Sequence, residues 1–129
     1  MKHWIPKKSY NVGLCSGRHV VLTNEGRPMA GYLFNNPVDN PTATDVHEKV
    51  CRDAIQDFIN HCRDMDNKGI APYTRYSLYV TGLTPLLTSF LKAWVERQEQ
   101  LEMGFGDLIL WHWNTETEQY VPQKWAMIT

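Results

Sequence analysis

The residues best suited to bind an anion follow a short β-rich run, where Thr81, Gly82, Leu83, Thr84 and Pro85 stand in order. Gly82 lets the backbone approach a ligand closely, because glycine has no side chain. Thr84 is the expected N-cap of a helix and Pro85 its first helical residue, so the free amides of the first turn would face outward. This pattern predicts an anion site that includes Thr81, Gly82 and Thr84. The alternative is a well-capped helix start that binds nothing.

Two further strand ends add candidate ligand-binding residues. Arg18 and His19 follow Gly17 after the first predicted strand. A charge-assisted hydrogen bond from Arg18 to phosphate would be worth about 1.5–3 kcal/mol, and a solvated turn arginine is the alternative. Trp113 and Asn114 end another strand, where an indole can stack on a base and a carboxamide can bind a base edge. Alternating aromatic residues also form cores, and asparagine also suits a turn.

Signals for catalysis or a metal are weak. The chain has no recognisable serine, histidine and aspartate motif and no glycine-rich Walker loop. His19 and His112 are the histidines near predicted strand ends, and either can act as a general acid or base. The three cysteines, Cys15, Cys51 and Cys62, lack the paired spacing of a zinc site, and reduced thiols in a cytoplasm are the simplest account. We therefore expect no catalytic residue, metal or cofactor.

Length and composition indicate a single domain over residues 1–129. Of these 129 residues, 43% are hydrophobic and 21% are charged, as is usual for a globular domain. The net charge of −1 argues against binding of a DNA or RNA polymer or an anionic membrane, which requires a basic surface. No apolar run approaches the roughly 20 residues of a membrane-spanning helix, and the basic start lacks the apolar stretch of a signal peptide. We expect a cytoplasmic protein.

Hydrophobic periodicity predicts the elements that position these residues. Strands are expected over 10–15, 77–81, 107–113 and 120–125, and a hairpin of 19–23 with 29–34 around a glycine turn. Pro122 makes the last strand an edge strand. Two helices are expected, the first from Asp45 to Lys68-Gly69 and the second starting after Thr84.

The expected core stripes lie at helical spacing. In the first helix the row is Val46, Val50, Ala54 and Phe58, and Asp45 with Glu48 forms an acidic capping box. In the second helix, which Gly104 or Gly106 would end, the stripe is Leu87, Phe90, Leu91, Trp94 and Val95.

Strands alternating with helices predict a small mixed, mainly parallel sheet with two helices and a C-terminal antiparallel hairpin. Ligands bind such sheets beyond the carboxyl ends of the strands.

Three stretches together resemble a known family. They are 11–19 (NVGLCSGRH), 78–84 (LYVTGLT) and 110–123 (LWHWNxETxxYxPQ), and the likeness extends over 10–34 and 77–125. They resemble phage-encoded proteins of the first Thoeris anti-defence type. The resemblance implies a non-catalytic protein that sequesters a cyclic nucleotide immune signal, such as cyclised ADP-ribose, in the host cytoplasm. It also implies a homo-oligomer, a dimer or a hexamer, with ligand sites near subunit boundaries. Residues 1–9 and 20–29 depart from the family pattern, which puts the identity of the ligand in question.

The residues leave two other functions open. A ring nuclease that cleaves cyclic oligoadenylates would need His19 or His112 near the scissile phosphate. An interaction protein without a small ligand is the third possibility. The hypothesis we carry forward is the sponge, with Arg18 and the Thr84 helix start holding phosphate and Trp113 and Asn114 contacting base or ribose.

Overall fold

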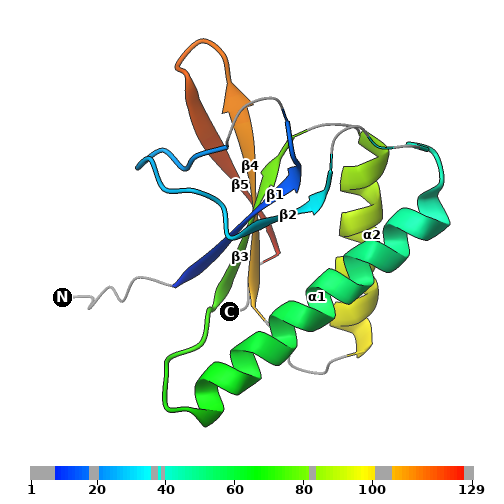
Figure 1. The fold of residues 1–129 in the computed structure, drawn as a ribbon. Coiled ribbons are helices and arrows are strands. Elements are labelled where there is room, and N and C mark those ends of the chain that lie inside the picture. The colour runs from blue at the N-terminus through cyan, green and yellow to red at the C-terminus, as the bar shows by residue number, and fades with distance from the viewer. Residues whose placement is uncertain are drawn as a thin grey trace.

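The computed structural model describes residues 8–17, 21–35, 38, 40–81, 84–100 and 106–126. Its elements are β1 (Ser9–Cys15), β2 (Gly31–Phe34), α1 (Thr44–Asn67), β3 (Arg75–Val80), α2 (Thr84–Gln100), β4 (Asp107–Asn114) and β5 (Gln119–Ala126). The strands form one sheet in the order β2-β1-β3-β4-β5, parallel except for the β4–β5 hairpin (Figure 1). The predicted fold class, with its mainly parallel sheet, two helices and antiparallel hairpin, is confirmed.

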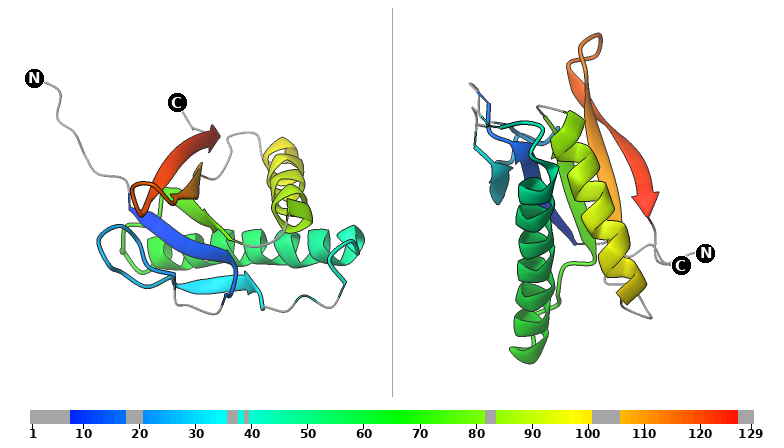
Figure 2. Two further views of the ribbon diagram at one scale, coloured as in Figure 1. Left: turned by 90° about the horizontal axis from the view of Figure 1, so that it is seen from above. Right: turned by 90° about the vertical axis from the view of Figure 1, so that its right-hand side faces the viewer.

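Both helices cover the same face of the sheet, so the protein has two layers. In the right-hand view of Figure 2, α1 and α2 run side by side in front of the strands. The core lies between the layers and includes Val12, Leu14, Ile55, Phe58, Tyr76, Leu78, Phe90, Trp94, Leu108 and Leu110. In β4, Leu108 and Leu110 face the helices, whereas Trp111 packs on the opposite face, called the open face below.

Helix α1 faces the core differently from the prediction. Its N-cap is Ala43, which makes no side-chain capping bond, so the predicted cap at Asp45 is wrong and Asp45 lies in the first turn. Val46, placed in the predicted core row, is 61% exposed. An α-helix has 3.6 residues per turn, so a row at i, i+4 spacing winds about 40° around the axis at each step. Gly69, with a φ of 74°, follows the end of α1 as predicted.

Contacts between the helices explain other differences. Glu48, predicted to complete a capping box, is instead buried and forms an ion pair of 2.6 Å with Lys92 of α2. Phe90 and Trp94 are buried as predicted, but Val95 is 41% exposed, and Leu86 and Ala93 occupy core positions.

Helix α2 begins at Thr84 itself, one residue before the predicted first helical position, Pro85. The predicted end at Gly104 lies outside the described residues, and Gly106 directly precedes β4.

The predicted glycine turn is present, because Gly26 has a φ of 79° and its N–H donates to Thr23 O at 2.8 Å, but the predicted strand pairing of 19–23 with 29–34 is wrong. In the described part of this segment, a single isolated antiparallel bridge joins Leu22 to Pro28. Residues 31–34 instead pair with β1 in parallel, because β1 offers them a free edge next to the core. The preceding residues, the 21–29 loop, pack on the open face through Val21, which contacts Tyr79 and Tyr120.

Candidate ligand-binding site

The order of the strands reverses between β1 and β3. From β1 the chain enters β2 on one side and then returns to β3 on the other. In open α/β sheets ligands bind outside the carboxyl ends of the strands at such a point. Here the Thr81 hydroxyl donates a hydrogen bond to Cys15 O at 2.6 Å and accepts one from Cys15 N at 3.2 Å. Thr81 therefore joins the two strand ends beyond their last paired residues, Gly13 and Tyr79.

A cavity of about 740 Å³, called the upper cavity below, lies beside Thr81. Its walls are the start of the 21–29 loop, the end of β3 and the β4–β5 hairpin, with a lining that includes Val21, Leu22, Thr81, Trp113, Glu118 and Tyr120. Trp113 is 50% exposed and meets the Tyr120 ring edge-on, with ring centroids 5.1 Å apart. Thr81 and Trp113, predicted from separate strand ends, thus line one cavity.

The other predicted site residues have different positions. Arg18, His19 and Gly82 lie outside the described residues, so their roles stay predictions. Thr84 is exposed at the start of α2 and is not among the described residues that line the upper cavity. Asn114 Oδ1 accepts hydrogen bonds from the backbone N–H groups of residues 116 and 117, at 2.9 and 3.4 Å. This side chain therefore forms the turn of the hairpin, which was the alternative interpretation of Asn114.

Asn24 attaches the 21–29 loop to β5. Its Nδ2 donates a hydrogen bond to Tyr120 O at 3.0 Å, and its Oδ1 accepts one from Tyr120 N at 2.9 Å. At the other side of the open face, Val21 N donates to the Tyr32 hydroxyl at 3.1 Å. Tyr32 lies across Gly13, where an added Cβ would be 2.4 Å from the ring. Gly13 therefore makes room for the tyrosine that holds this end of the loop.

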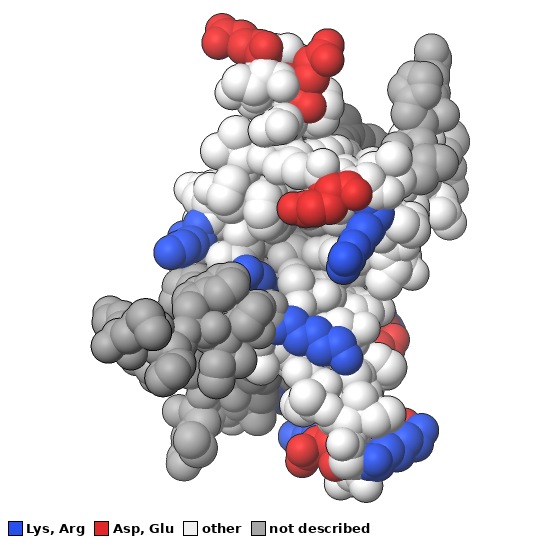
Figure 3. Space-filling model, turned by 90° about the vertical axis from the view of Figure 1, so that its left-hand side faces the viewer, with Lys and Arg blue, Asp and Glu red and all other residues white. Residues whose placement is uncertain are grey.

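A second cavity of about 650 Å³, called the lower cavity, lies on the other side of the 21–29 loop. Its lining includes Lys8, Ser9, Asn11, Arg27, Arg75 and Trp111. Figure 3 views the protein from this side and shows lysine and arginine side chains gathered across the middle of the face. The acidic side chains at the top of that view lie at the tip of the β4–β5 hairpin. The sequence interpretation contained no site at this position.

Two tyrosines between the cavities keep their protons at neutral pH. Burial raises the pKa of Tyr79 to about 12, and Glu25 and Tyr120 add to the shift. Burial also raises the pKa of Tyr120. The Tyr79 ring stacks on Trp111 with an interplanar angle of 6° and centroids 5.5 Å apart. These neutral phenols can therefore donate hydrogen bonds on the open face.

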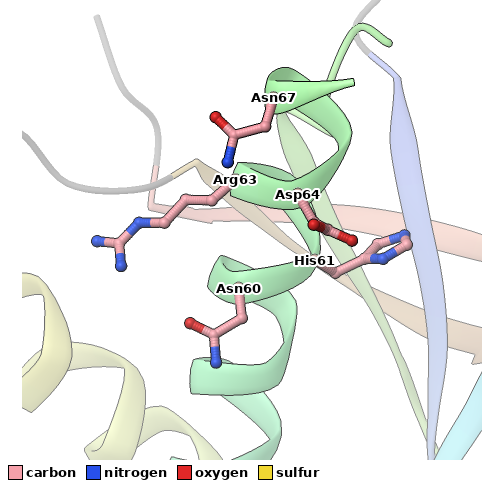
Figure 4. A pocket seen from close by; sticks show the side chains of 5 residues that line it. All are labelled: Asn60, His61, Arg63, Asp64 and Asn67. Atoms are coloured by element: carbon pink, nitrogen blue, oxygen red, sulfur yellow. The ribbon is translucent and has the colours of Figure 1, made fainter. Parts of the chain in front are cut away.

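Two other groups of polar side chains in the described residues, around His112 and beside α1, do not form a convergent site. His112 Nε2 lies 2.8 Å from Gln123 Oε1, and because side chains alternate along a strand, His112 points away from the face that carries Trp111 and Trp113. A shallow hollow beside α1 is lined by Asn60, His61, Arg63, Asp64 and Asn67. In Figure 4, His61 and Asp64 point to one side of the helix and the other three to the opposite side, so the five do not converge.

Neither a cluster of metal ligands nor a membrane-spanning helix is found among the described residues. Among them, no group of three histidine, cysteine, aspartate or glutamate side chains is placed to hold a metal ion. None of the helices described here is both long and apolar enough to cross a membrane.

Comparison with known proteins identifies no relative. The chain matches no protein-family model, no curated protein and no solved structure at a significant level. The candidate site therefore rests on the geometry of this chain.

Proposed function

We propose that the protein is a phage anti-defence sponge, which binds a cyclic nucleotide immune signal in the host cytoplasm and sequesters it intact. The signal would be a cyclised ADP-ribose or a cyclic oligonucleotide. The observation that carries the proposal is the meeting of Thr81 and Trp113 in one cavity at the carboxyl end of β3. Its volume of about 740 Å³ falls in the range of small-molecule sites, roughly 300–1,000 Å³.

In the proposal, different residues at the upper cavity bind the base and the phosphate of the nucleotide. The half-exposed Trp113 ring, supported by Tyr120, offers a surface on which a base can stack. Apolar contacts come from Val21 and Leu22. In the proposal the phosphate is held by Arg18, which precedes Val21 by three residues in the sequence.

Retention rather than cleavage is proposed because the described lining of the upper cavity offers no pair of groups for general acid and general base catalysis. His112 points away from the upper cavity and is hydrogen-bonded to Gln123. Among the described lining residues, Glu118 is the only one with a carboxylate, and it lies in the hairpin turn. A ring nuclease would depend on His19, so the test below includes cleavage as an outcome.

The proposal includes a homo-oligomer, a dimer or a hexamer. Nanomolar binding corresponds to about −12 kcal/mol, and it must also overcome several kcal/mol of lost translational and rotational freedom. A second copy that completes the cavity would add contacts to those of one chain. Val121, which is 46% exposed on strand β5, gives the outer strand of the sheet an apolar side chain against which such a copy can pack.

The test is a depletion experiment with recovery. The purified protein is mixed with cyclic oligonucleotides and cyclised ADP-ribose isomers, and free ligand is followed by chromatography before and after heat denaturation. We expect one ligand to disappear from solution and to return intact on heating. The protein in the same sample should elute at a multiple of its 15.0 kDa mass. Return of linear fragments would identify a nuclease instead, and no depletion of any ligand would contradict the proposal.

A further inference from the structure

We propose that the lower cavity is a second binding site, which takes the phosphoryl group of a phosphorylated small molecule. The cavity lies across the 21–29 loop from the upper cavity, and among the described lining residues the two share only Thr23. The proposal therefore does not depend on the function proposed for the upper cavity.

Positive charge is concentrated in this cavity. The lining contains three cationic side chains, Lys8, Arg27 and Arg75, and one carboxylate, Glu25. This leaves a surplus of two positive charges (three minus one). Asp107, opposite Arg75 in the sheet register, offsets part of that surplus. The whole chain has a net charge of −1, so the cationic character is local. A local surplus of this kind attracts a small anion rather than a polymer.

Two hydrogen-bond donors of the lining lack an acceptor. Arg75 Nε and Trp111 Nε1 are buried and have no hydrogen-bond partner in the part of the chain that the structure describes. Arg75 and Trp111 belong to the neighbouring strands β3 and β4, and both line the lower cavity. Buried donors are nearly always paired in native proteins, and leaving one unpaired is unfavourable. Trp111 is opposite Tyr79, four residues along β3 from Arg75, which separates the two backbones by about 13 Å. A phosphoryl group could therefore accept from one of the two donors, and another acceptor of the same molecule from the other.

Other groups hold Lys8 and the backbone of Arg27 in place. Lys8 Nζ lies 4.6 Å from the centroid of the Tyr73 ring. Arg27 lies in a turn in which Thr23 N donates to Arg27 O at 2.8 Å and Arg27 N donates to Thr23 Oγ1 at 3.1 Å. The ion pairs found between described residues include neither Arg27 nor Arg75. Their guanidinium groups therefore remain available for bidentate binding of phosphoryl oxygens.

The lining indicates that the phosphoryl group belongs to a larger molecule. The cavity volume of about 650 Å³ is that of a small-molecule site, well above the needs of a free phosphate ion. Neutral groups such as Ser9 and Asn11 lie beside the cations. Ser9 Oγ is 2.6 Å from Ser77 Oγ and donates to Asn11 Oδ1 at 3.2 Å, so this polar network is already ordered. A nucleoside monophosphate has the charge and size for this cavity.

The experiment is a calorimetric titration with AMP, pyrophosphate, inorganic phosphate and the uncharged adenosine. We expect saturable binding of AMP and pyrophosphate, weaker binding of inorganic phosphate and none of adenosine. Arg27→Ala and Arg75→Ala should each weaken AMP binding at least about tenfold, because each removes a charge-assisted contact. Arg27 is exposed on a loop, so its variant tests the site even if Arg75→Ala destabilises the sheet. Arg63→Ala removes the same charge from the surface of α1 and should change nothing.

Variants of the upper cavity separate the two proposals. Trp113→Ala should leave the AMP affinity unchanged, since Trp113 does not line the lower cavity. Loss of AMP binding in Trp113→Ala with retention in Arg27→Ala would overturn the present proposal and leave the sponge function standing. Equal binding of adenosine and AMP, or equal weakening by Arg63→Ala and Arg27→Ala, would also overturn it. So would a parent protein that binds none of the phosphate compounds.

Discussion

Trp113 and Trp125 differ in their surroundings rather than in their exposure. Their exposed fractions are 50% and 45%, but Trp113 lines the upper cavity against Tyr120 whereas Trp125 lies near the end of β5, outside the lining of both cavities. Stacking of a base on an aromatic side chain is worth about 1–3 kcal/mol. Trp113→Ala should therefore weaken ligand binding about tenfold, measured as free ligand remaining in the depletion experiment, and Trp125→Ala should deplete ligand like the parent.

The two tryptophan variants control for each other. Each removes one half-exposed indole from the same hairpin, so a loss of stability alone would affect both, which thermal melting would reveal. Equal depletion by the two variants would show that the upper cavity does not stack a base. If only Trp125→Ala lost binding, the ligand site would lie along β5.

At the scale of elements, Asn24 acts as a short substitute for a neighbouring strand. Its carboxamide pairs with both the N–H and the C=O of Tyr120, in the way that an adjacent backbone would. Asn24→Ala leaves both backbone groups without this partner, at a cost of about 1–3 kcal/mol. We expect faster exchange of the Tyr120 amide, because that N–H loses its acceptor. We also expect weaker ligand binding at both cavities, because the 21–29 loop forms a wall of each. Asn24→Asp keeps the acceptor and should protect the Tyr120 amide better than Asn24→Ala; equal exchange in the two variants would contradict this role.

The sequence predicted strands and helices well because period and turn residues are local signals. It did not predict which strand residues lie side by side, and the lower cavity depends on that register. Ser9 is opposite Arg75, and Asn11 is opposite Ser77, across β1 and β3, which are more than sixty residues apart in the chain. The hairpin prediction failed for the same reason, since the free edge of β1 competes with local pairing. That Thr81 and Trp113 lie close enough to line one cavity could be predicted, because the carboxyl ends of parallel strands share one edge.

At the scale of the whole molecule, two helices on one face leave the other face to a loop. The core on the helix side is continuous across the three central strands, whereas the open face holds a small cluster of Val21, Tyr79 and Tyr120 between two cavities. If both proposals hold, stability depends mainly on the helix face and binding on the open face. Substitutions on the open face are expected to change binding more than folding, with the buried tyrosines as the exception.

Buried tyrosines should make the fold sensitive to alkali. Burial raises the pKa of Tyr79 from 10.0 to about 12 and also raises that of Tyr76, and the hydrogen bond that Lys92 donates to Glu48 raises the pKa of Lys92. Each group holds its proton more tightly in the folded chain. The resulting stabilisation is complete below the unfolded pKa near pH 10 and is lost as the pH rises through the folded value. The free energy of unfolding, measured by urea denaturation, should therefore fall between pH 10 and 12 by at most about 1.4 kcal/mol per pH unit for each tyrosine. Tyr79→Phe should make the fall shallower, and an unchanged slope in that variant would show that Tyr79 already ionises normally in the folded protein.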